Sequence, residues 1–441
     1  MLLTERKDDL LCGNVNVSES GELLFAGMST TELAKKYKTP LYLIDEDRIR
    51  ERCRTYLSAV KDFLGDKGHV LYASKALSFK RIYEIMKSEE MGIDVVSSGE
   101  IATAVKAGFP LERAFFHSNN KTDEDVSFAM EKGVGYFVVD NAEELYAIDE
   151  EAKRRSITQK ILLRITPGID PHTYDEVATG KVDSKFGSAI ETGQAESITA
   201  LALSFENISL CGFHCHVGSL VFDSSVYVKT VDTMLGFISD MKKKLGFSAS
   251  VLDLGGGFGV RYIPEHPVID IRKEIESVAK RLVEKSAELG IGMPDIYFEP
   301  GRSIVADAGM TLYTVGTVKR IPGYKNYVSV DGGMTDSPRY ILYGARYTVL
   351  PADNMYSERD MECSLVGRCC ESGDIIAEGI TLPSDIKRGD TVAVLTTGAY
   401  HYSMASNYNR IPRPPVVMIS DKSSYIAVRR ETFDDITSCD I

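Results

Sequence analysis

Lys75, at the end of a predicted strand, is the residue whose position first indicates a chemical role. Residues 70–73 form a short apolar run rich in β-formers, and Ser74 and Lys75 follow it directly. The next stretch, 79–87, carries apolar residues at helical spacing, so Lys75 is expected where a strand passes into a helix. Burial there would favour the neutral amine, which is the form that makes a Schiff base. A solvated loop lysine is the alternative, because most lysines are exposed.

Polar or glycine-rich residues end each of eight predicted strands. The strands are predicted at 70–73, 93–96, 114–116, 136–139, 161–165, 212–216, 250–254 and 296–298. From the first strand to the eighth, these ends carry the following residues: Ser74 and Lys75; Asp94 and 97–100; 117–120; Asp140 and Asn141; Arg164; 214–219; 255–259; and 299–302. In α/β barrels the active site lies at the C-terminal ends of the strands. We therefore expect these side chains to surround one ligand.

Two of these loops predict a phosphate site. The glycine run 255–259 follows the seventh strand, and Gly301 and Arg302 follow the eighth. Glycines let backbone amides approach phosphate oxygens closely, and barrels often bind a phosphate with these two loops. A dinucleotide-binding fingerprint does not fit, because Val260 stands where its third glycine belongs. A tight turn without a ligand remains the alternative.

A lysine, a phosphate loop and a carboxylate at one barrel mouth point to pyridoxal phosphate. This cofactor requires a lysine and a partner for its pyridine nitrogen. Glu299 can be that partner, and His216 can stack on the ring, although a packed core histidine is the alternative for His216. We expect no metal on His214, His216 and the nearby cysteines, because side chains alternate along a strand and the two residue types face opposite ways.

The order of elements predicts the fold. Strands that alternate with helices form βαβ units, and eight in series indicate a closed (β/α)8 TIM-like barrel. Helices are predicted at 47–64, 99–107, 122–132, 142–154, 192–203, 224–244 and 271–289, and further β-rich runs at 303–318, 326–331, 362–368 and 391–395. We expect a pyridoxal-phosphate-binding barrel at 41–304, entered through a strand at 41–45. Residues 1–40 and 305–441 would together form a second, all-β domain.

Composition and charge exclude several classes of function. The net charge of −13 argues against nucleic-acid and anionic-membrane partners, which require a basic face. The N-terminus has no long apolar core of a signal peptide, and no run of the 441 residues is apolar enough to span a bilayer. The eight cysteines lack a disulfide framework spacing and are typical of cytosolic thiols. We expect a cytoplasmic protein.

The sequence resembles the fold-type III pyridoxal-phosphate-dependent decarboxylases, the Orn/Lys/Arg decarboxylase class II family, and within it the diaminopimelate decarboxylases. The resemblance covers nearly the whole chain. It is carried by 72–76, 179–187, 214–219, 299–302, 342–345, 370–374, 398–400 and 403–409. The runs 183–187 and 370–374 favour the diaminopimelate decarboxylases over the ornithine and arginine decarboxylases.

The resemblance implies a lyase that converts meso-2,6-diaminopimelate to L-lysine and CO2, the last step of lysine biosynthesis. It implies Lys75, Cys370 and His216 as catalytic residues, with Cys370 giving the proton that replaces CO2. Together with the strand ends, it predicts cofactor contacts from Lys75, Asp94, Arg164, His216, Ser219, Gly256, Gly257, Glu299, Gly301, Arg302 and Tyr400. The implied substrate contacts are Arg302, Arg339, Tyr343, Glu371 and Tyr400. It further implies a homodimer in which Cys370 and Glu371 reach the partner's site.

Other functions stay open at this point. A decarboxylase of lysine, ornithine or arginine would need acids at the far end of its substrate, whereas Arg302 and Arg339 suit a second carboxylate. A pyridoxal-phosphate-binding protein without turnover would lack Cys370 or Glu299, and both are present. Some residues depart from or blur the family pattern: Cys369 is a second thiol beside Cys370, and Arg346, Tyr347, His401 and Tyr402 are individual to this sequence.

Overall fold

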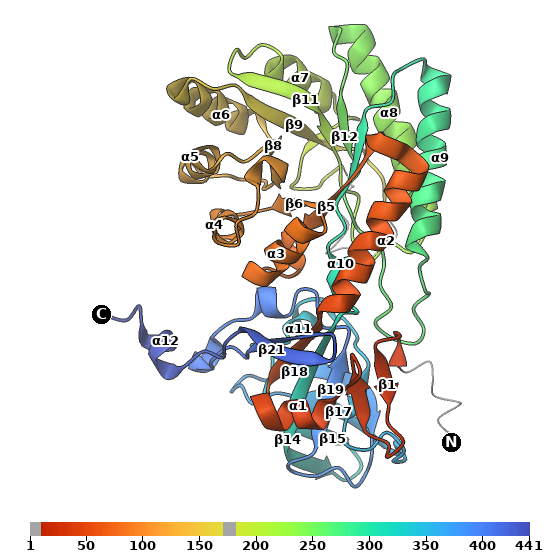
Figure 1. Ribbon diagram of the computed structural model, residues 1–441, viewed down its shortest axis with the longest axis vertical. Helices are drawn as coiled ribbons and strands as arrows, with labels where there is room; N and C mark the ends of the chain where they lie inside the picture. Colours follow the sequence, from red (N-terminus) through yellow and green to blue (C-terminus); the bar gives the residue numbers. More distant parts are fainter. Residues whose placement is uncertain (1–9, 171–181) are drawn as a thin grey trace. The chain divides into compact units, whose positions relative to one another are not determined.

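The computed structural model describes residues 10–170 and 182–441, and its contacts divide the chain into two compact units (Figure 1). The β unit consists of Met1–Glu51, of which residues from 10 onward are described, together with Val260–Val268 and Arg302–Ile441. The barrel unit consists of Arg52–Gly259 and Ile269–Gly301.

Eight parallel strands close the barrel. They are β5 (Gly68–Ala73), β6 (Gly92–Val95), β7 (Ala114–Phe116), β8 (Tyr136–Val139), β9 (Gln159–Thr166), β11 (Ile208–His214), β12 (Val251–Asp253) and β13 (Asp295–Phe298). Each pairs with the next, β13 pairs with β5, and the pairing of β8 with β9 is part of the same ring. The short β10 (Ser188–Ala189) adds to β9. The predicted (β/α)8 fold is confirmed, and each of the eight predicted strands overlaps an observed one. The largest difference is β11, which begins at Ile208 and ends at His214, whereas the prediction was 212–216.

Apolar side chains from different strands fill the barrel. Leu71, Phe115, Val138, Leu162 and Val251 come from five strands and form one buried cluster. Such layers make the interior of a barrel a packed core, so ligands are confined to its mouth.

Amphipathic helices cover the strands on the outside (Figure 1). They are α3 (Lys80–Ser88), α4 (Ser98–Lys106), α5 (Asp123–Lys132), α6 (Ala142–Arg155), α7 (Gln194–Ala202), α8 (Ser225–Leu245) and α9 (Ile271–Leu289), and α2 (Glu46–Leu64) leads into β5. Local signals set their ends: Thr122 and Asp125 form a capping box on α5, and Gly133 ends that helix in the left-handed conformation. Among the described helices, none has both the length and the apolar composition for crossing a membrane.

The β unit is built from segments far apart in the chain. Its small sheet contains β1 (Val15–Val17), β2 (Leu23–Phe25) and β3 (Met28–Ser29), and α1 (Thr30–Tyr37) follows. The larger sheet contains β4 (Leu41–Asp45), β14 (Gly309–Ile321), β15 (Lys325–Val330), β16 (Val349–Pro351), β17 (Met361–Val366), β18 (Ile375–Leu382), β19 (Thr391–Leu395), β20 (Val416–Ser420) and β21 (Ser423–Val428). One core holds Phe25 and Leu43 together with Leu312 and Val417. The N-terminal and C-terminal segments therefore complete one β-rich domain, as predicted.

Two local expectations differ from the structure. The strand at 41–45 does not belong to the barrel: β4 pairs with β14 on one side and with β20 on the other. All five of its residues are buried, which is typical of a strand in the middle of a covered sheet. Residues 303–305 are helical, within α10 (Arg302–Val305), and three further helices of the predicted all-β domain, α1, α11 (Arg339–Tyr343) and α12 (Phe433–Thr437), were not expected. The domain boundaries at residues 41 and 304 stay a prediction.

We expect Gly212→Ala to destabilise the barrel. A Cβ atom at Gly212 would lie 1.8 Å from the carbonyl oxygen of Val251 on the paired strand. Forcing the strands apart should lower the free energy of unfolding by about 1–3 kcal/mol, measured by urea denaturation. Gly236→Ala in α8 is the matched control, because no atom lies within 4 Å of its added Cβ; it should raise stability by about 0.5–1 kcal/mol. Equal stability of the two variants would contradict this packing.

Candidate active site

Lys75 lies at the barrel mouth, in a short turn (Ser74–Ala76) that directly follows β5. Ser74 is fully buried while Lys75 is exposed. The backbone N–H of Ala73 donates to the carbonyl of Pro300 at 3.3 Å, which fixes this turn against the loop after β13. Burial raises the pKa of Glu100 to about 7, and the charge of Lys75 is among the groups that oppose this rise. Lys75 thus lies at the end of a strand as predicted, but its side chain is exposed, whereas the sequence led us to expect burial.

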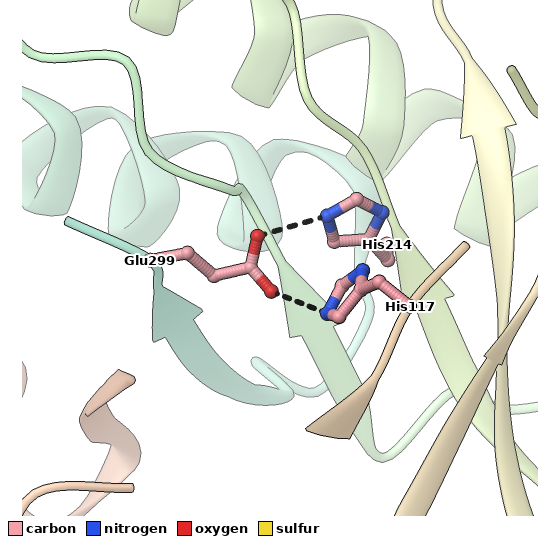
Figure 2. Close-up of side chains that lie close together, drawn as sticks. All are labelled: His117, His214 and Glu299. Atoms are coloured by element: carbon pink, nitrogen blue, oxygen red, sulfur yellow. Dashed lines mark hydrogen bonds and ion pairs between the residues drawn. The ribbon is translucent and has the colours of Figure 1, made fainter. Parts of the chain in front are cut away.

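Glu299, which follows β13, is held by two histidines (Figure 2). The Nε2 atom of His117 lies 2.8 Å from Oε1 of Glu299, and Nε2 of His214 lies 3.1 Å from Oε2. All three residues are buried. Burial raises the pKa of Glu299, but the two histidines lower it by more, and the net pKa lies well below the usual value. The carboxylate is therefore an anion inside the barrel.

The same three residues have the spacing of a metal site, since their ligand atoms lie within 4.8 Å of one another. However, each carboxylate oxygen contacts an imidazole nitrogen directly at hydrogen-bond distance. The contact of His214 with Glu299 is a hydrogen bond, and that of His117 with Glu299 is a close ion-pair contact. Asp94 extends it, because Oδ1 of Asp94 lies 3.8 Å from Nε2 of His117.

The glycine loop after β12 is shaped by close backbone contacts. Gly257 has a φ of 103°, and a Cβ atom there would lie 2.1 Å from the carbonyl oxygen of Gly218. The backbone N–H of Gly256 donates to Nδ1 of His216 at 3.3 Å. Burial, followed by the charges of Lys75 and Arg164, lowers the pKa of His216 well below its usual value. His216 is thus a neutral ring held against the glycine loop.

The remaining cofactor candidates of the barrel unit lie on neighbouring strand ends or loops. Asp94 lies near the end of β6 and is buried, while Arg164 on β9 is half-buried with its guanidinium 4.3 Å from the ring centroid of Phe186. Ser219 lies in the loop after β11, and Gly301 packs against Ala73. An amine, an anionic carboxylate, a neutral imidazole and a glycine loop therefore surround one barrel mouth. This set of groups fits pyridoxal phosphate.

The β unit contains a second cluster, which is built around Tyr400. The guanidinium of Arg302 lies 4.6 Å from the ring centroid of Tyr400, and that of Arg339 lies 5.1 Å from it. Nη1 of Arg302 donates to the hydroxyl of Tyr262 at 2.9 Å, and Arg339 lies 4.9 Å from the ring of Tyr343. Tyr400 has a φ of 62°, a left-handed conformation that costs energy in a non-glycine residue and is concentrated at binding sites.

Both arginines of this cluster are buried. None of the described acids forms an ion pair with Arg339. Burying a guanidinium without an anionic partner is costly, so this arrangement is suited to a ligand that brings a carboxylate.

Cys370 and Glu371 are exposed on the loop between β17 and β18. The backbone N–H of Cys370 donates to Oδ1 of Asn409 at 2.8 Å, and that of Cys369 donates to Oδ2 of Asp374 at 2.6 Å. Burial, reinforced by the charge of Asp374, raises the pKa of the Cys369 thiol to about 11. The two thiols therefore differ: Cys370 is accessible, whereas Cys369 is partly enclosed.

The predicted site residues thus form groups within each unit. The barrel unit brings Lys75, Asp94, Arg164, His216, Ser219, Gly256, Gly257, Glu299 and Gly301 to one mouth, and the β unit holds Arg302, Arg339, Tyr343, Tyr400, Cys370 and Glu371. The motif residues 179–181 lie outside the described residues. His117, His214 and Tyr262 were not among the site residues predicted from the sequence. The two histidines end predicted strands and could have been found by position, but nothing local marks Tyr262.

Comparisons with known proteins identify the family to which the chain belongs. A family model described as pyridoxal-dependent decarboxylase, pyridoxal binding domain, matches residues 46–306. The chain is 42% identical to the diaminopimelate decarboxylase of Bacillus subtilis (strain 168), over 98% of both chains. The structure of diaminopimelate decarboxylase from M. jannaschii in co-complex with L-lysine is 31% identical, with a TM-score of 0.89 over 97% of this chain and 98% of that one. A lysine/ornithine decarboxylase from Vibrio vulnificus, complexed with putrescine, is 25% identical, with a TM-score of 0.73 over 88% of this chain and 97% of that one.

Asp336, in the loop that leads to Arg339, gives a pH-dependent prediction. Its carboxyl is buried, accepts hydrogen bonds from the Tyr313 hydroxyl and the Gly333 N–H, and has a pKa raised to about 7, chiefly by burial. A pKa that is higher in the folded than in the unfolded state contributes stability at low pH, which is lost as pH rises towards 7. We expect the free energy of unfolding to fall by about 2–3 kcal/mol more between pH 5 and 8 in the wild type than in Asp336→Asn.

Urea denaturation at both pH values measures this difference. Glu358→Gln, which removes an exposed acid from the same unit, is the control and should keep the wild-type pH dependence. Parallel pH profiles of wild type and Asp336→Asn would show that Asp336 does not titrate in this range.

Proposed function

The chain belongs to the pyridoxal-dependent decarboxylases, and we propose that it removes one carboxyl group of meso-2,6-diaminopimelate to give L-lysine and CO2. This reaction is the last step of lysine biosynthesis. The observation that carries the choice of substrate is the pair of buried guanidinium groups on Tyr400, of which Arg339 has no acidic partner among the described residues. Diaminopimelate carries a carboxylate at both ends, so one end can react while the other binds an arginine.

The barrel mouth holds the cofactor in this proposal. Pyridoxal phosphate, when bound, supplies a sink for the electron pair that CO2 leaves behind. The amine of Lys75 would attach the cofactor covalently, Glu299 would bind the pyridine nitrogen and His216 would stack on the ring. Gly256, Gly257 and Gly301 would offer backbone amides to the phosphate, and Asp94, Arg164 and Ser219 belong to the same unit. The family resemblance adds Arg302 and Tyr400 of the β unit as phosphate contacts.

Proton delivery is assigned to Cys370. Its Sγ donates a proton to the substrate carbon that has lost CO2, and the thiolate recovers a proton from water. Cys369 is less suited to this role because it is partly enclosed and its backbone is tied to Asp374. Arg302, Arg339, Tyr343, Glu371 and Tyr400 bind the substrate.

The active protein is proposed to be a homodimer with shared sites. Cys370 and Glu371 are exposed, and the neighbouring helix α11 leaves Ile341 and Leu342 with 41% and 52% of their surface accessible. In this proposal the two exposed apolar side chains lie in the interface with a second copy of the chain. A second copy of the chain, facing its barrel mouth towards this loop, would complete each site. We place the dimer in the cytoplasm, where its eight free thiols stay reduced.

We expect purified protein with added pyridoxal phosphate to release CO2 from meso-diaminopimelate, with kcat/KM at least about 10²-fold higher than for lysine, ornithine or arginine. The physical reason is that only diaminopimelate brings an anion to Arg339. Release of labelled CO2 measures the rates. Preferred turnover of one of the other three amino acids would identify the chain as a decarboxylase of that substrate instead.

Paired arginine variants serve as controls for this specificity. Arg339→Gln should raise KM for diaminopimelate about 10-fold or more through loss of a charge-assisted hydrogen bond. Arg346→Gln, which removes an exposed arginine from a nearby loop, should leave KM unchanged. An unchanged KM in Arg339→Gln would remove Arg339 from the substrate site.

Complementation between two inactive variants tests the shared site. Lys75→Ala should abolish the visible absorbance of the covalently held cofactor, whereas Cys370→Ala should keep it and turn over roughly 10²-fold or more slowly. Random exchange of subunits should restore roughly a quarter of wild-type activity, because half the dimers then hold one intact site. No recovery after verified subunit exchange would mean that each chain acts alone.

A further inference from the structure

We propose that His117 and His214 are positioning residues that hold both oxygens of Glu299 and so keep the pyridine nitrogen of the cofactor protonated. This inference rests on the proposed function, in which Glu299 binds that nitrogen. It assigns roles to two residues that do not themselves contact the reacting atoms.

His214 acts as a neutral donor. Its Nε2 lies 3.1 Å from Oε2 of Glu299, while its Nδ1 is buried without a hydrogen-bond partner among the described residues. A ring nitrogen without an acceptor is best left unprotonated, so the single proton lies on Nε2 and points to Glu299. Burial also lowers the pKa of His214 to about 4, which keeps the ring uncharged.

His117 has a different environment, because it lies between two carboxylates. Its Nε2 is 2.8 Å from Oε1 of Glu299 and 3.8 Å from Oδ1 of Asp94. Its backbone N–H donates to the carbonyl of Val95 at 2.8 Å, which fixes it at the end of β7 beside β6. The rings of His117 and His214 pack edge to face at 4.8 Å, so each limits the rotation of the other.

The two contacts together fix the carboxylate and favour its ionised form. Oε2 accepts the N–H of His214, whereas Oε1 has Nε2 of His117 at ion-pair distance and no partner with hydrogen-bond geometry among the described residues. Oε1 therefore remains available to a pyridinium donor. The side chain of Glu299 cannot turn without breaking a buried hydrogen bond. Asp94, Asp253 and Cys215 also interact electrostatically with this carboxylate as acidic groups, and Arg164 interacts with it as a cation. The neutral ring of His216 lies within electrostatic range of Glu299 as well.

Replacement of one donor at a time tests this role. His214→Phe and His117→Phe keep a ring but remove the N–H, whereas His214→Gln and His117→Gln keep a donor at a similar distance. His69→Phe is the control: His69 stacks on Tyr297 at 4.5 Å, near the start of β5 at the other end of the strands. The probe is pyridoxal phosphate labelled with 15N in its ring, bound to each variant without substrate.

The expected result is a change in the titration of the bound ring nitrogen. In the Phe variants the pH at which half of the 15N signal is protonated should fall by about 1–2 units, because a charge-assisted hydrogen bond to Glu299 is lost. The cofactor should also bind about 10-fold more weakly. The Gln variants and His69→Phe should titrate as the wild type does. If the Phe variants fail to fold, His→Asn variants replace them, because their shorter amide does not reach Glu299.

Two outcomes would overturn the inference. One is an unchanged 15N titration in the Phe or Asn variants, and the other is a Gln variant that titrates as its Phe counterpart does. Neither depends on turnover. Wild-type protein that binds the cofactor but releases no CO2 from diaminopimelate would contradict the proposed substrate. The 15N result would still test the roles of His117 and His214.

Discussion

The barrel mouth depends on one buried anion, the carboxylate of Glu299. A carboxylate loses much hydration inside a protein and stays ionised only if donors replace the water. His214 at the end of β11 provides a hydrogen bond, and His117 after β7 provides a close ion-pair contact, while Glu299 follows β13. These contacts hold the ends of three strands, β7, β11 and β13, next to one another around the site. A pyridoxal-dependent decarboxylase needs such a fixed anion, because a mobile or protonated carboxyl would not hold a pyridinium.

Close backbone packing forms the other side of this mouth. Gly257 and Gly301 stand where a Cβ atom would collide with Gly218 or Ala73, so the loops after β11, β12 and β13 and the end of β5 lie against each other. The turn that carries Lys75 is tied to the same place through Ala73 and Pro300. The amine and the glycine loop are therefore held by rigid strand ends, which preserves their spacing when a ligand binds.

The β unit contains two buried guanidinium groups that can bind an anion. Arg302 and Arg339 lie against the ring of Tyr400, and the aromatic faces offset part of the cost of burying two cations. The loops that carry Arg339 and Cys370 are joined by Asp374, which accepts N–H groups from Met334 and Cys369. Asp374 thus ties the loop that leads to Arg339, a proposed substrate contact, to the loop of Cys370, the proposed proton donor.

The sequence by itself determined the eight strands, their order and the chemistry at their ends, because apolar runs and polar ends are local patterns. Lys75, Glu299 and the glycine run could be recognised in this way, and their placement at one mouth follows from the barrel. Tertiary structure alone decided that β4 pairs with β14 and β20, that His117 and His214 converge on Glu299, and that Tyr262 reaches Arg302. Each of these contacts joins residues far apart in the chain. Their formation depends on three-dimensional packing, which no local pattern encodes.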